Sequence, residues 1–175
     1  MRLPVIFCFA LLLALHSLSS AQKATVGRVA ANEMAGSFIY GGGPDGIRYS
    51  SLKQINRENV AELQVAWTYD TADGPGDPQT QPVIVGGVLY GITPRHKIIA
   101  LDAATGRLIW RFDLGPIAQG ANRGVTYWEA GSDRRIFAAI KNYLYALDAA
   151  TGKPVADFGQ GGRIDLREGL GRDPQ

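Results

Sequence analysis

Short apolar runs alternate with glycine-rich or polar turns along the second half of the chain. Residues 83–90 hold two apolar stretches around the dipeptide Gly86-Gly87, a pattern typical of a β-hairpin. Further β-branched and aromatic runs follow at 98–101 and 108–112, on either side of a polar turn. This spacing predicts a four-stranded antiparallel sheet with strands at 81–85, 88–92, 98–102 and 107–112.

A second set of apolar runs follows the first. Val125–Trp128 and Arg135–Ala139 flank the turn Gly131-Ser132-Asp133, which predicts another hairpin. The second sheet is expected to have strands at 124–128, 135–140, 143–147 and near 153–158.

The segment before these two sheets carries a weaker pattern. Residues 55–63 are expected to form one short helical turn with Asn56 as its N-cap. The stretch from Val60 to Tyr69 ends in an aromatic cluster that contains Trp67, one repeat period before Trp110. We expect it to be the last strand of an earlier sheet.

The two predicted sheets share an identical seven-residue segment. Ala100–Gly106 and Ala146–Gly152 both read ALDAATG, at an offset of 46 residues. In each copy the aspartate can accept hydrogen bonds from turn amides, and the glycine can adopt the left-handed conformation that closes a short hairpin. A repeat of about 40–50 residues with strand-like content is typical of β-propeller blades.

The length of the chain limits how much of a propeller it can form. A closed propeller has about four to eight blades, whereas 175 residues hold only about two blades and flanking strands. Two blades leave unpaired sheet edges. We therefore expect an all-β chain that is the N-terminal part of a longer propeller; a small two-sheet β-domain, complete in itself, is the alternative.

The first 21 residues have a different character from the rest. Met1-Arg2 precedes the apolar run Leu3–Leu15, and small residues at 19–21 end the segment. These features predict a cleaved secretory signal peptide at 1–21 and a periplasmic or secreted protein. The alternative for residues 1–21 is an uncleaved N-terminal anchor. A linker at 22–37 and the propeller part at 38–175 would follow this segment.

The amino-acid composition argues against several classes of function. The chain has 18 basic and 16 acidic residues, which argues against the clustered basic surface that nucleic acid requires. The 22 glycines exceed the usual share of about 7% and fit a fold with many tight turns. The one cysteine, Cys8, lies in the predicted signal peptide, so the mature chain has no disulfide, cysteine nucleophile or Cys/His zinc cluster.

Several segments together resemble the start of the quinoprotein dehydrogenases, enzymes that use pyrroloquinoline quinone (PQQ). The matching segments are Tyr40–Asn56, Leu63–Tyr69, Pro82–Tyr90, Arg123–Trp128 and Asp157–Arg167. RYSSL at 48–52 and RGVTYW at 123–128 make the resemblance specific, whereas the ALDAATG-type repeat also occurs in propellers without enzymatic activity. The resemblance covers residues 38–171 and is strongest to the glucose-dehydrogenase-like, membrane-associated branch.

This resemblance implies a fold and an activity. The fold would be an eight-bladed propeller of four-stranded antiparallel blades, with PQQ near its axis beside a calcium ion. The protein would be a periplasmic oxidoreductase that oxidises a sugar or alcohol and passes electrons to a quinone or cytochrome. It would associate with the membrane through this electron-transfer chain. Calcium ligands and the catalytic base would lie beyond Gln175, so no catalytic or metal residue is assigned here. A non-catalytic PQQ-like repeat propeller, acting as a binding or assembly scaffold, is the alternative.

The resemblance also points to three cofactor-contacting residues. Arg123 matches the family arginine of an Arg-Gly-x-x-Tyr segment, and its guanidinium fork suits a carboxylate of PQQ. The alternative interpretation is that Arg123 lies at a strand edge and forms a surface ion pair. Gln79 matches a family Glu or Gln that faces the quinone; a polar loop residue is the alternative. Gln119 matches a position that is often histidine. Arg134 and Arg135 lack such a match and are expected to be solvated hairpin residues.

The chain also departs from the family pattern. Asn122 stands where several members carry cysteine before the arginine, which excludes a redox-active disulfide there. Ala139 replaces an expected threonine and removes one hydroxyl contact. Trp67 and Trp110 fit the tryptophans that pack between blades, but Ala156 stands 46 residues after Trp110. The next contact between blades is therefore expected to lack a large aromatic side chain.

Overall fold

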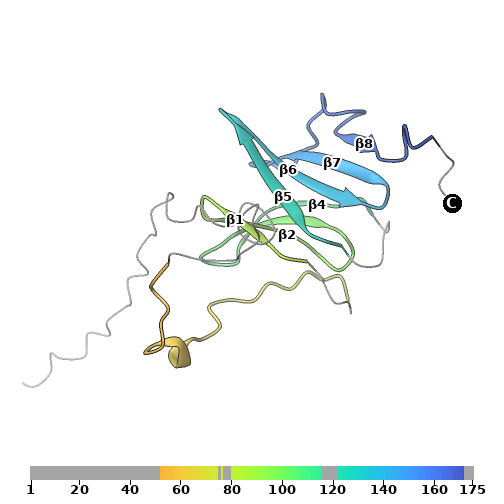
Figure 1. The fold of residues 1–175 in the computed structure, drawn as a ribbon. Coiled ribbons are helices and arrows are strands. Elements are labelled where there is room, and N and C mark those ends of the chain that lie inside the picture. Colours follow the sequence, from red (N-terminus) through yellow and green to blue (C-terminus); the bar gives the residue numbers. More distant parts are fainter. Residues whose placement is uncertain (1–51, 75, 77–79, 116–121, 172–175) are drawn as a thin grey trace, which may run out of the picture.

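The computed structural model describes residues 52–74, 76, 80–115 and 122–171. These residues fold into two four-stranded antiparallel sheets, each with its strands in sequence order (Figure 1). The first sheet contains β1 (Val83–Val85), β2 (Val88–Ile92), β3 (Ile98–Asp102) and β4 (Leu108–Phe112). The second contains β5 (Val125–Ala130), β6 (Asp133–Ile140), β7 (Tyr143–Asp148) and β8 (Arg163–Asp165). The predicted all-β class, with four-stranded antiparallel sheets, is confirmed.

The first sheet forms at the predicted positions, because its turns are encoded locally. Gly86 and Gly87 have φ angles of +56° and +80°, which glycine adopts without strain. The β1–β2 turn that they form brings Val85 opposite Val88. β2 and β3 have the predicted bounds, and β1 and β4 begin slightly later than predicted.

Both copies of the repeat form the predicted turn. Asp102 Oδ1 accepts hydrogen bonds from the backbone N–H of Thr105 at 2.9 Å and from its hydroxyl at 2.8 Å. Asp148 Oδ1 accepts the equivalent bonds from Thr151 at 2.8 and 2.6 Å. The glycines that end the two turns have φ angles of +72° and +69°. The aspartate and glycine of the repeat therefore have the roles that the sequence predicts.

The fourth strand of the second sheet is not where the sequence pattern placed it. Residues 153–158 do not form this strand; it is β8, at 163–165. The chain begins to pair at Pro154, which forms an isolated bridge with Leu147. Val155 N–H still donates to the Ala146 carbonyl at 2.9 Å. The chain then leaves the sheet, because residues 156–158 form a turn and the glycines at 159, 161 and 162 adopt positive φ angles typical of turns.

This excursion, residues 156–161, changes which residue matches Trp110. Trp110 pairs with Ala100 in the first sheet. The repeat equivalent of Ala100 is Ala146, whose N–H donates to the carbonyl of Gly162 at 2.9 Å. Gly162, rather than Ala156, therefore occupies the position of Trp110 in the ladder, and the equivalence expected for Ala156 is wrong.

The excursion carries an aromatic side chain back onto the sheet. The ring of Phe158 meets Phe137 edge-on at 5.4 Å between centroids. Phe137 is opposite Ala146 and so matches Tyr90, which is opposite Ala100 in the first sheet. Phe158 thus covers Phe137 on a face that a tryptophan covers in the first sheet.

The hydrophobic core lies between the two sheets. Tyr90 is at its centre, with ring centroids of Trp110 at 5.9 Å and Tyr127 at 6.2 Å. Ile98, Ile136 and Leu147 are also fully buried there. The Tyr90 hydroxyl donates to the carbonyl of Ala149 at 3.2 Å, so the phenol joins the two sheets through both packing and a hydrogen bond.

Two tryptophans each dock on the next copy of the repeat turn. Trp67 Nε1 donates to the carbonyl of Ala103 at 3.1 Å, and Trp110 Nε1 donates to that of Ala149 at 2.9 Å. Each indole also covers the glycine that ends its turn, where an added Cβ would lie 2.5 Å from the ring. The prediction that these tryptophans pack between repeat units is confirmed.

The segment that carries Trp67 is not a strand. Residues 63–74 follow a short 3-10 helix, η2 (Val60–Glu62), and have no ladder partner among the described residues. A strand needs such a neighbour for its backbone groups, so the expected strand ending at Tyr69 is wrong. The short helical turn is confirmed. Asn59 directly precedes η2 but makes no side-chain cap bond, whereas Asn56 Oδ1 accepts the N–H of Glu58 at 2.9 Å and that of Asn59 at 3.3 Å, as predicted for an N-cap.

Candidate functional site

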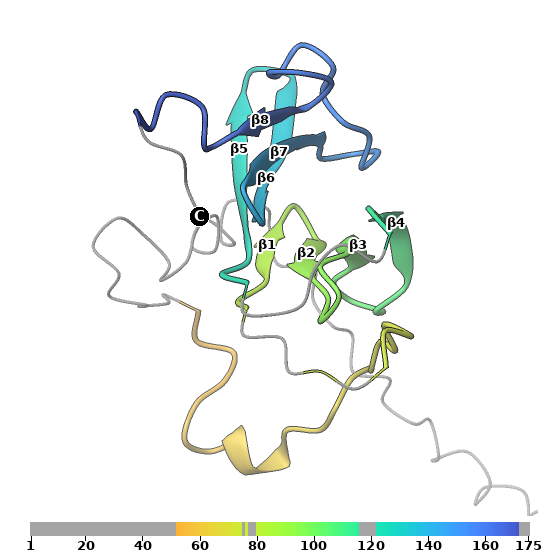
Figure 2. The same cartoon turned by 90° about the vertical axis from the view of Figure 1, so that its right-hand side faces the viewer.

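β1 and β5 begin side by side, at the same end of the two sheets (Figure 2). Gln81 and Gly124, just before these strands, form an isolated parallel bridge. Because neighbouring strands are antiparallel, the β2–β3 and β6–β7 connections lie at this end too. We call it the leading end; it comprises residues 80–82, 93–97, 113–115, 122–124 and 141–142.

Arg123 lies at the leading end, directly before the bridge. Its side chain is exposed and has no hydrogen bond or ion pair with any residue of the described ranges. The surface ion pair considered from the sequence is thus not formed within this part of the chain. No acceptor among the described residues occupies the guanidinium donors of Arg123, and such donors suit an anion.

Gly124 keeps the starts of β1 and β5 close together. Its φ angle is +101°, and an added Cβ would lie 2.8 Å from both the Gln81 carbonyl oxygen and Thr80 Oγ1. A side chain at this position would therefore push the two strand starts apart. Thr80 Oγ1 is buried here and has no hydrogen-bond partner among the described residues.

Asn122 is buried on the other side of Arg123, at 8% exposure. Its Nδ2 donates to the carbonyl of Ala139 in β6 at 2.9 Å, and its Oδ1 accepts the N–H of Gly124 at 2.8 Å. Sequence reasoning identified this residue only as the replacement of a family cysteine. It missed the bracing role, because nothing local shows that the carbonyl of Ala139 lies within reach.

The other two predicted cofactor residues cannot be placed. Gln79 and Gln119 lie outside the described residues. In the sequence, Gln79 comes two residues before Gln81, which is bridged to Gly124. Gln119 comes four residues before Arg123.

A buried ion pair ties the segment before β1 to the β2–β3 connection. Asp73, at 4% exposure, contacts Lys97 Nζ through Oδ1 at 2.5 Å and accepts the Arg95 N–H through Oδ2 at 3.0 Å. Burial raises the pKa of Asp73, but the bonds from Lys97, Thr93 and Arg95 outweigh it, so this pKa lies below its usual value. The sequence carries no signal for this pair, because its members are far apart along the chain.

The two neighbouring arginines of β6 differ from each other. Arg134 is exposed, as expected. The Arg135 side chain is only 18% exposed, contacts Asp133 Oδ2 at 2.7 Å and lies 5.7 Å from the centre of the Trp128 ring. The expectation that Arg135 is a solvated residue is wrong, because an aspartate and an aromatic ring at hairpin-neighbour positions cover its guanidinium.

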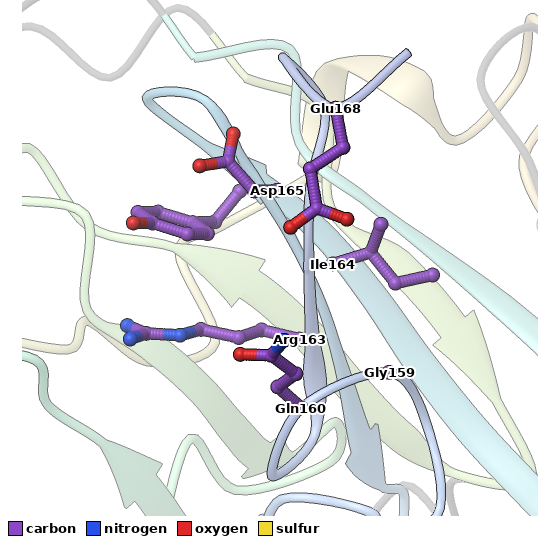
Figure 3. A pocket seen from close by; sticks show the side chains of 7 residues that line it. Gly159, Gln160, Arg163, Ile164, Asp165 and Glu168 are labelled. Carbon is purple, nitrogen blue, oxygen red and sulfur yellow. The ribbon is translucent and has the colours of Figure 1, made fainter.

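A polar cavity of about 140 Å³ lies beside β8 (Figure 3). Its lining residues are Tyr143, Gly159, Gln160, Arg163, Ile164, Asp165 and Glu168. The Arg163 guanidinium stacks 4.4 Å from the centre of the Tyr143 ring. Hydrogen bonds from Arg167 and Asn142 hold the pKa of Asp165 below its usual value. The cavity contains none of the residues that the sequence predicts for cofactor contact.

The described residues contain no cluster suited to a metal ion. In the ranges 52–74, 80–115 and 122–171, no three His, Cys, Asp or Glu side chains group closely enough to hold one. The candidate site that the described residues do form is cationic and is centred on the exposed Arg123.

The chain matches a known family of β-propeller domains. Residues 38–175 match the family profile "PQQ: Glucose/ethanol/alcohol dehydrogenase, beta-propeller domain", and the chain belongs to this family. The resemblance seen in the sequence is thereby confirmed.

Individual relatives are dehydrogenases. The chain is 34% identical to quinoprotein glucose dehydrogenase A of Acinetobacter calcoaceticus over 160 residues, which cover 74% of this chain and 20% of that protein. It is 45% identical to the dehydrogenase subunit of a quinone alcohol dehydrogenase of Gluconobacter oxydans (strain 621H), over 62% of this chain and 15% of that protein. The chain therefore spans about a fifth or less of these relatives.

A solved structure shares the fold. The quinohemoprotein alcohol dehydrogenase from Comamonas testosteroni superimposes with a TM-score of 0.64 at 30% sequence identity. The match covers 81% of this chain and 22% of that one. The two sheets thus correspond to part of a larger quinoprotein propeller.

Proposed function

We propose that the protein carrying this chain is a PQQ-dependent dehydrogenase that oxidises a sugar or an alcohol. The observation that carries the proposal is Arg123, exposed and without an anionic partner among the described residues, in a chain that belongs to a family of PQQ enzymes. The sequence resemblance suggests that it corresponds to the arginine of the Arg-Gly-x-x-Tyr segment. The relatives named above act on glucose and on alcohols, which supports a substrate with a hydroxyl group. They also favour an enzyme over a non-catalytic scaffold.

The leading end suits an anionic cofactor. PQQ carries carboxylates, and a guanidinium can bind a carboxylate through two parallel hydrogen bonds. Arg123 would bind and orient this carboxylate, and the buried Thr80 hydroxyl beside Gly124 is a further polar group that lacks a partner in the described part of the chain. When bound, PQQ would supply the two-electron acceptor for oxidation of the hydroxyl group.

The remaining cofactor contacts are also proposals. Gln79 would donate an amide hydrogen bond to the cofactor, and Gln119 would lie close to it. A calcium ion would be held by residues beyond Gln175.

A reconstitution experiment tests the activity. The full-length protein is freed of cofactor with a chelator and then titrated with PQQ and Ca²⁺, and dye-linked oxidation of glucose and ethanol is measured. We expect activity to appear only when PQQ is added. A folded protein that neither binds PQQ nor oxidises any sugar or alcohol would contradict the proposal.

We also propose that the protein is exported and passes electrons to a quinone or cytochrome at the membrane. The signal-like pattern of residues 1–21 supports export, and the quinone named for a relative supports such an acceptor. In the described ranges no helix has the length and apolarity to span a bilayer. N-terminal sequencing of the periplasmic protein should begin at Gln22; an intact N-terminus in the membrane fraction would contradict cleavage.

A further inference from the structure

We infer that Asn122 is a positioning residue, which fixes the direction of Arg123 toward the anionic ligand. The inference rests on the proposed function, because it assigns Arg123 to cofactor binding. The family resemblance assigns no role to Asn122.

The first reason is that Asn122 braces the backbone on both sides of Arg123. Its Nδ2 is bonded to the carbonyl of Ala139, close to the end of β6, and its Oδ1 is bonded to the N–H of Gly124, at the start of β5. The Asn122 side chain is nearly fully buried, so losing either bond would leave a buried polar group without a partner.

The second reason is that the chain after Arg123 is fixed to the neighbouring sheet. Gly124 is bridged to Gln81, and the two strand starts are so close that a Cβ added to Gly124 would lie 2.8 Å from the Gln81 carbonyl oxygen. Arg123 therefore lies between two hydrogen-bonded backbone positions, while its own side chain makes no hydrogen bond or ion pair with any described residue. Its direction is determined by the backbone, and a preorganised guanidinium loses less freedom when a ligand binds.

The third reason is that an amide has the chemistry that this position needs. One end must donate to a carbonyl and the other must accept from an N–H, which a carboxamide does with a single short side chain. Aspartate has the same shape but no donor, so its carboxylate would face the carbonyl oxygen of Ala139. Alanine removes both bonds.

A double-mutant experiment on the full-length protein tests the inference. Asn122→Ala and Asn122→Asp are each made in the wild-type and the Arg123→Ala backgrounds, and the Kd of the cofactor-free protein for PQQ is measured by titration. We expect each Asn122 change to weaken binding by about tenfold in the wild type and by less than about threefold when Arg123 is absent. A residue with a merely structural role would lower affinity equally in both backgrounds.

A matched control lies outside the leading end, in the segment before the first sheet. Asn59 Nδ2 donates to the carbonyl of Gln54 at 2.8 Å, and its Oδ1 accepts the N–H of Asn56 at 2.9 Å. Asn59→Ala should melt at a slightly lower temperature and bind PQQ as the wild type does. This control distinguishes the general effect of losing an asparagine hydrogen bond from the specific effect of losing the two Asn122 bonds that hold the backbone around Arg123.

The outcomes separate this inference from the proposed function. Equal losses in both backgrounds, wild-type affinity in a folded Asn122→Ala protein, or failure of both Asn122 variants to fold would overturn the positioning role alone. A wild-type protein that does not bind PQQ, or an Arg123→Ala protein that binds it as tightly as wild type, would overturn the cofactor assignment as well.

Discussion

At the scale of single residues, Arg123 makes the sharpest prediction. Replacing it by alanine in the full-length protein should remove a charge-assisted hydrogen bond worth about 1.5–3 kcal/mol, which weakens PQQ binding by roughly 10- to 150-fold. Lysine should restore binding only in part, because an ammonium lacks the planar fork. PQQ titration measures the effect, and thermal melting is the control, since an exposed side chain should not affect folding. Unchanged affinity in a folded variant would refute the assignment.

The glycines that end the repeat turns make a second prediction. Gly152→Ala would place a Cβ 2.5 Å from the Trp110 ring at a φ angle of +69°, so the free energy of unfolding should fall by about 2–4 kcal/mol. Gly86→Ala is the matched control, because its φ is also positive, at +56°, but no atom lies within 4 Å of the added Cβ.

The control should cost only about 1 kcal/mol, from backbone strain alone. Urea unfolding of both variants in the full-length protein measures the difference. If the two variants were equally stable, the close packing of Trp110 on its turn would not contribute to stability.

At the scale of elements, the Asp73–Lys97 pair links the segment before β1 to the β2–β3 connection. Asp73→Asn would leave the Lys97 ammonium only the more distant Asp113, whose Oδ2 lies 3.8 Å away, so the free energy of unfolding at pH 7 should fall by about 1–3 kcal/mol. The Asp73 side chain is fully buried, so solvent screens this pair little.

The same pair predicts a pH dependence. The pKa of Asp73 is lower in the folded protein than its usual 3.8, so its stabilising effect is present above about pH 4 and is lost as pH falls through the folded-state value. Wild type and Asp73→Asn should therefore converge in stability below about pH 4. Guanidinium unfolding between pH 7 and pH 3 tests this; a constant difference across that range would contradict it.

The elements also show which parts of the structure can be predicted from the sequence. The first sheet and both repeat turns depend on glycines, aspartates and alternating side chains within a few residues of each other, so the local sequence is sufficient to predict them. β8 was misplaced because the strand is interrupted by residues 156–161, and the repeat period does not reveal an insertion. The Asn122 brace and the Asp73 pair were missed because their partners are distant in the sequence.

At the scale of the whole molecule, one face of the second sheet should govern how the chain behaves alone. Tyr127 points into the core, so the next residue, Trp128, points the other way and is 43% exposed. Ile164 lies on the same face at 37% exposure. Expressed alone, the 175 residues should self-associate and show no dehydrogenase activity with PQQ and Ca²⁺.

Size-exclusion chromatography and binding of a hydrophobic dye test this prediction. Trp128→Lys should reduce both self-association and dye binding, whereas Arg134→Lys, at an exposed position on the same strand pair, should change neither. A monomeric chain that melts cooperatively and oxidises glucose would contradict the prediction.

The docking of the two tryptophans also bears on the order in which the sheets form during synthesis. Trp67 and Trp110 both precede the turns on which they dock, so a ribosome makes each indole before the turn that receives it. As each new sheet emerges, an aromatic side chain of the earlier segment is ready to bind its DAATG turn. Addition of sheets from the N-terminus toward the C-terminus is therefore favoured during synthesis, and each turn that closes adds its sheet to those already formed.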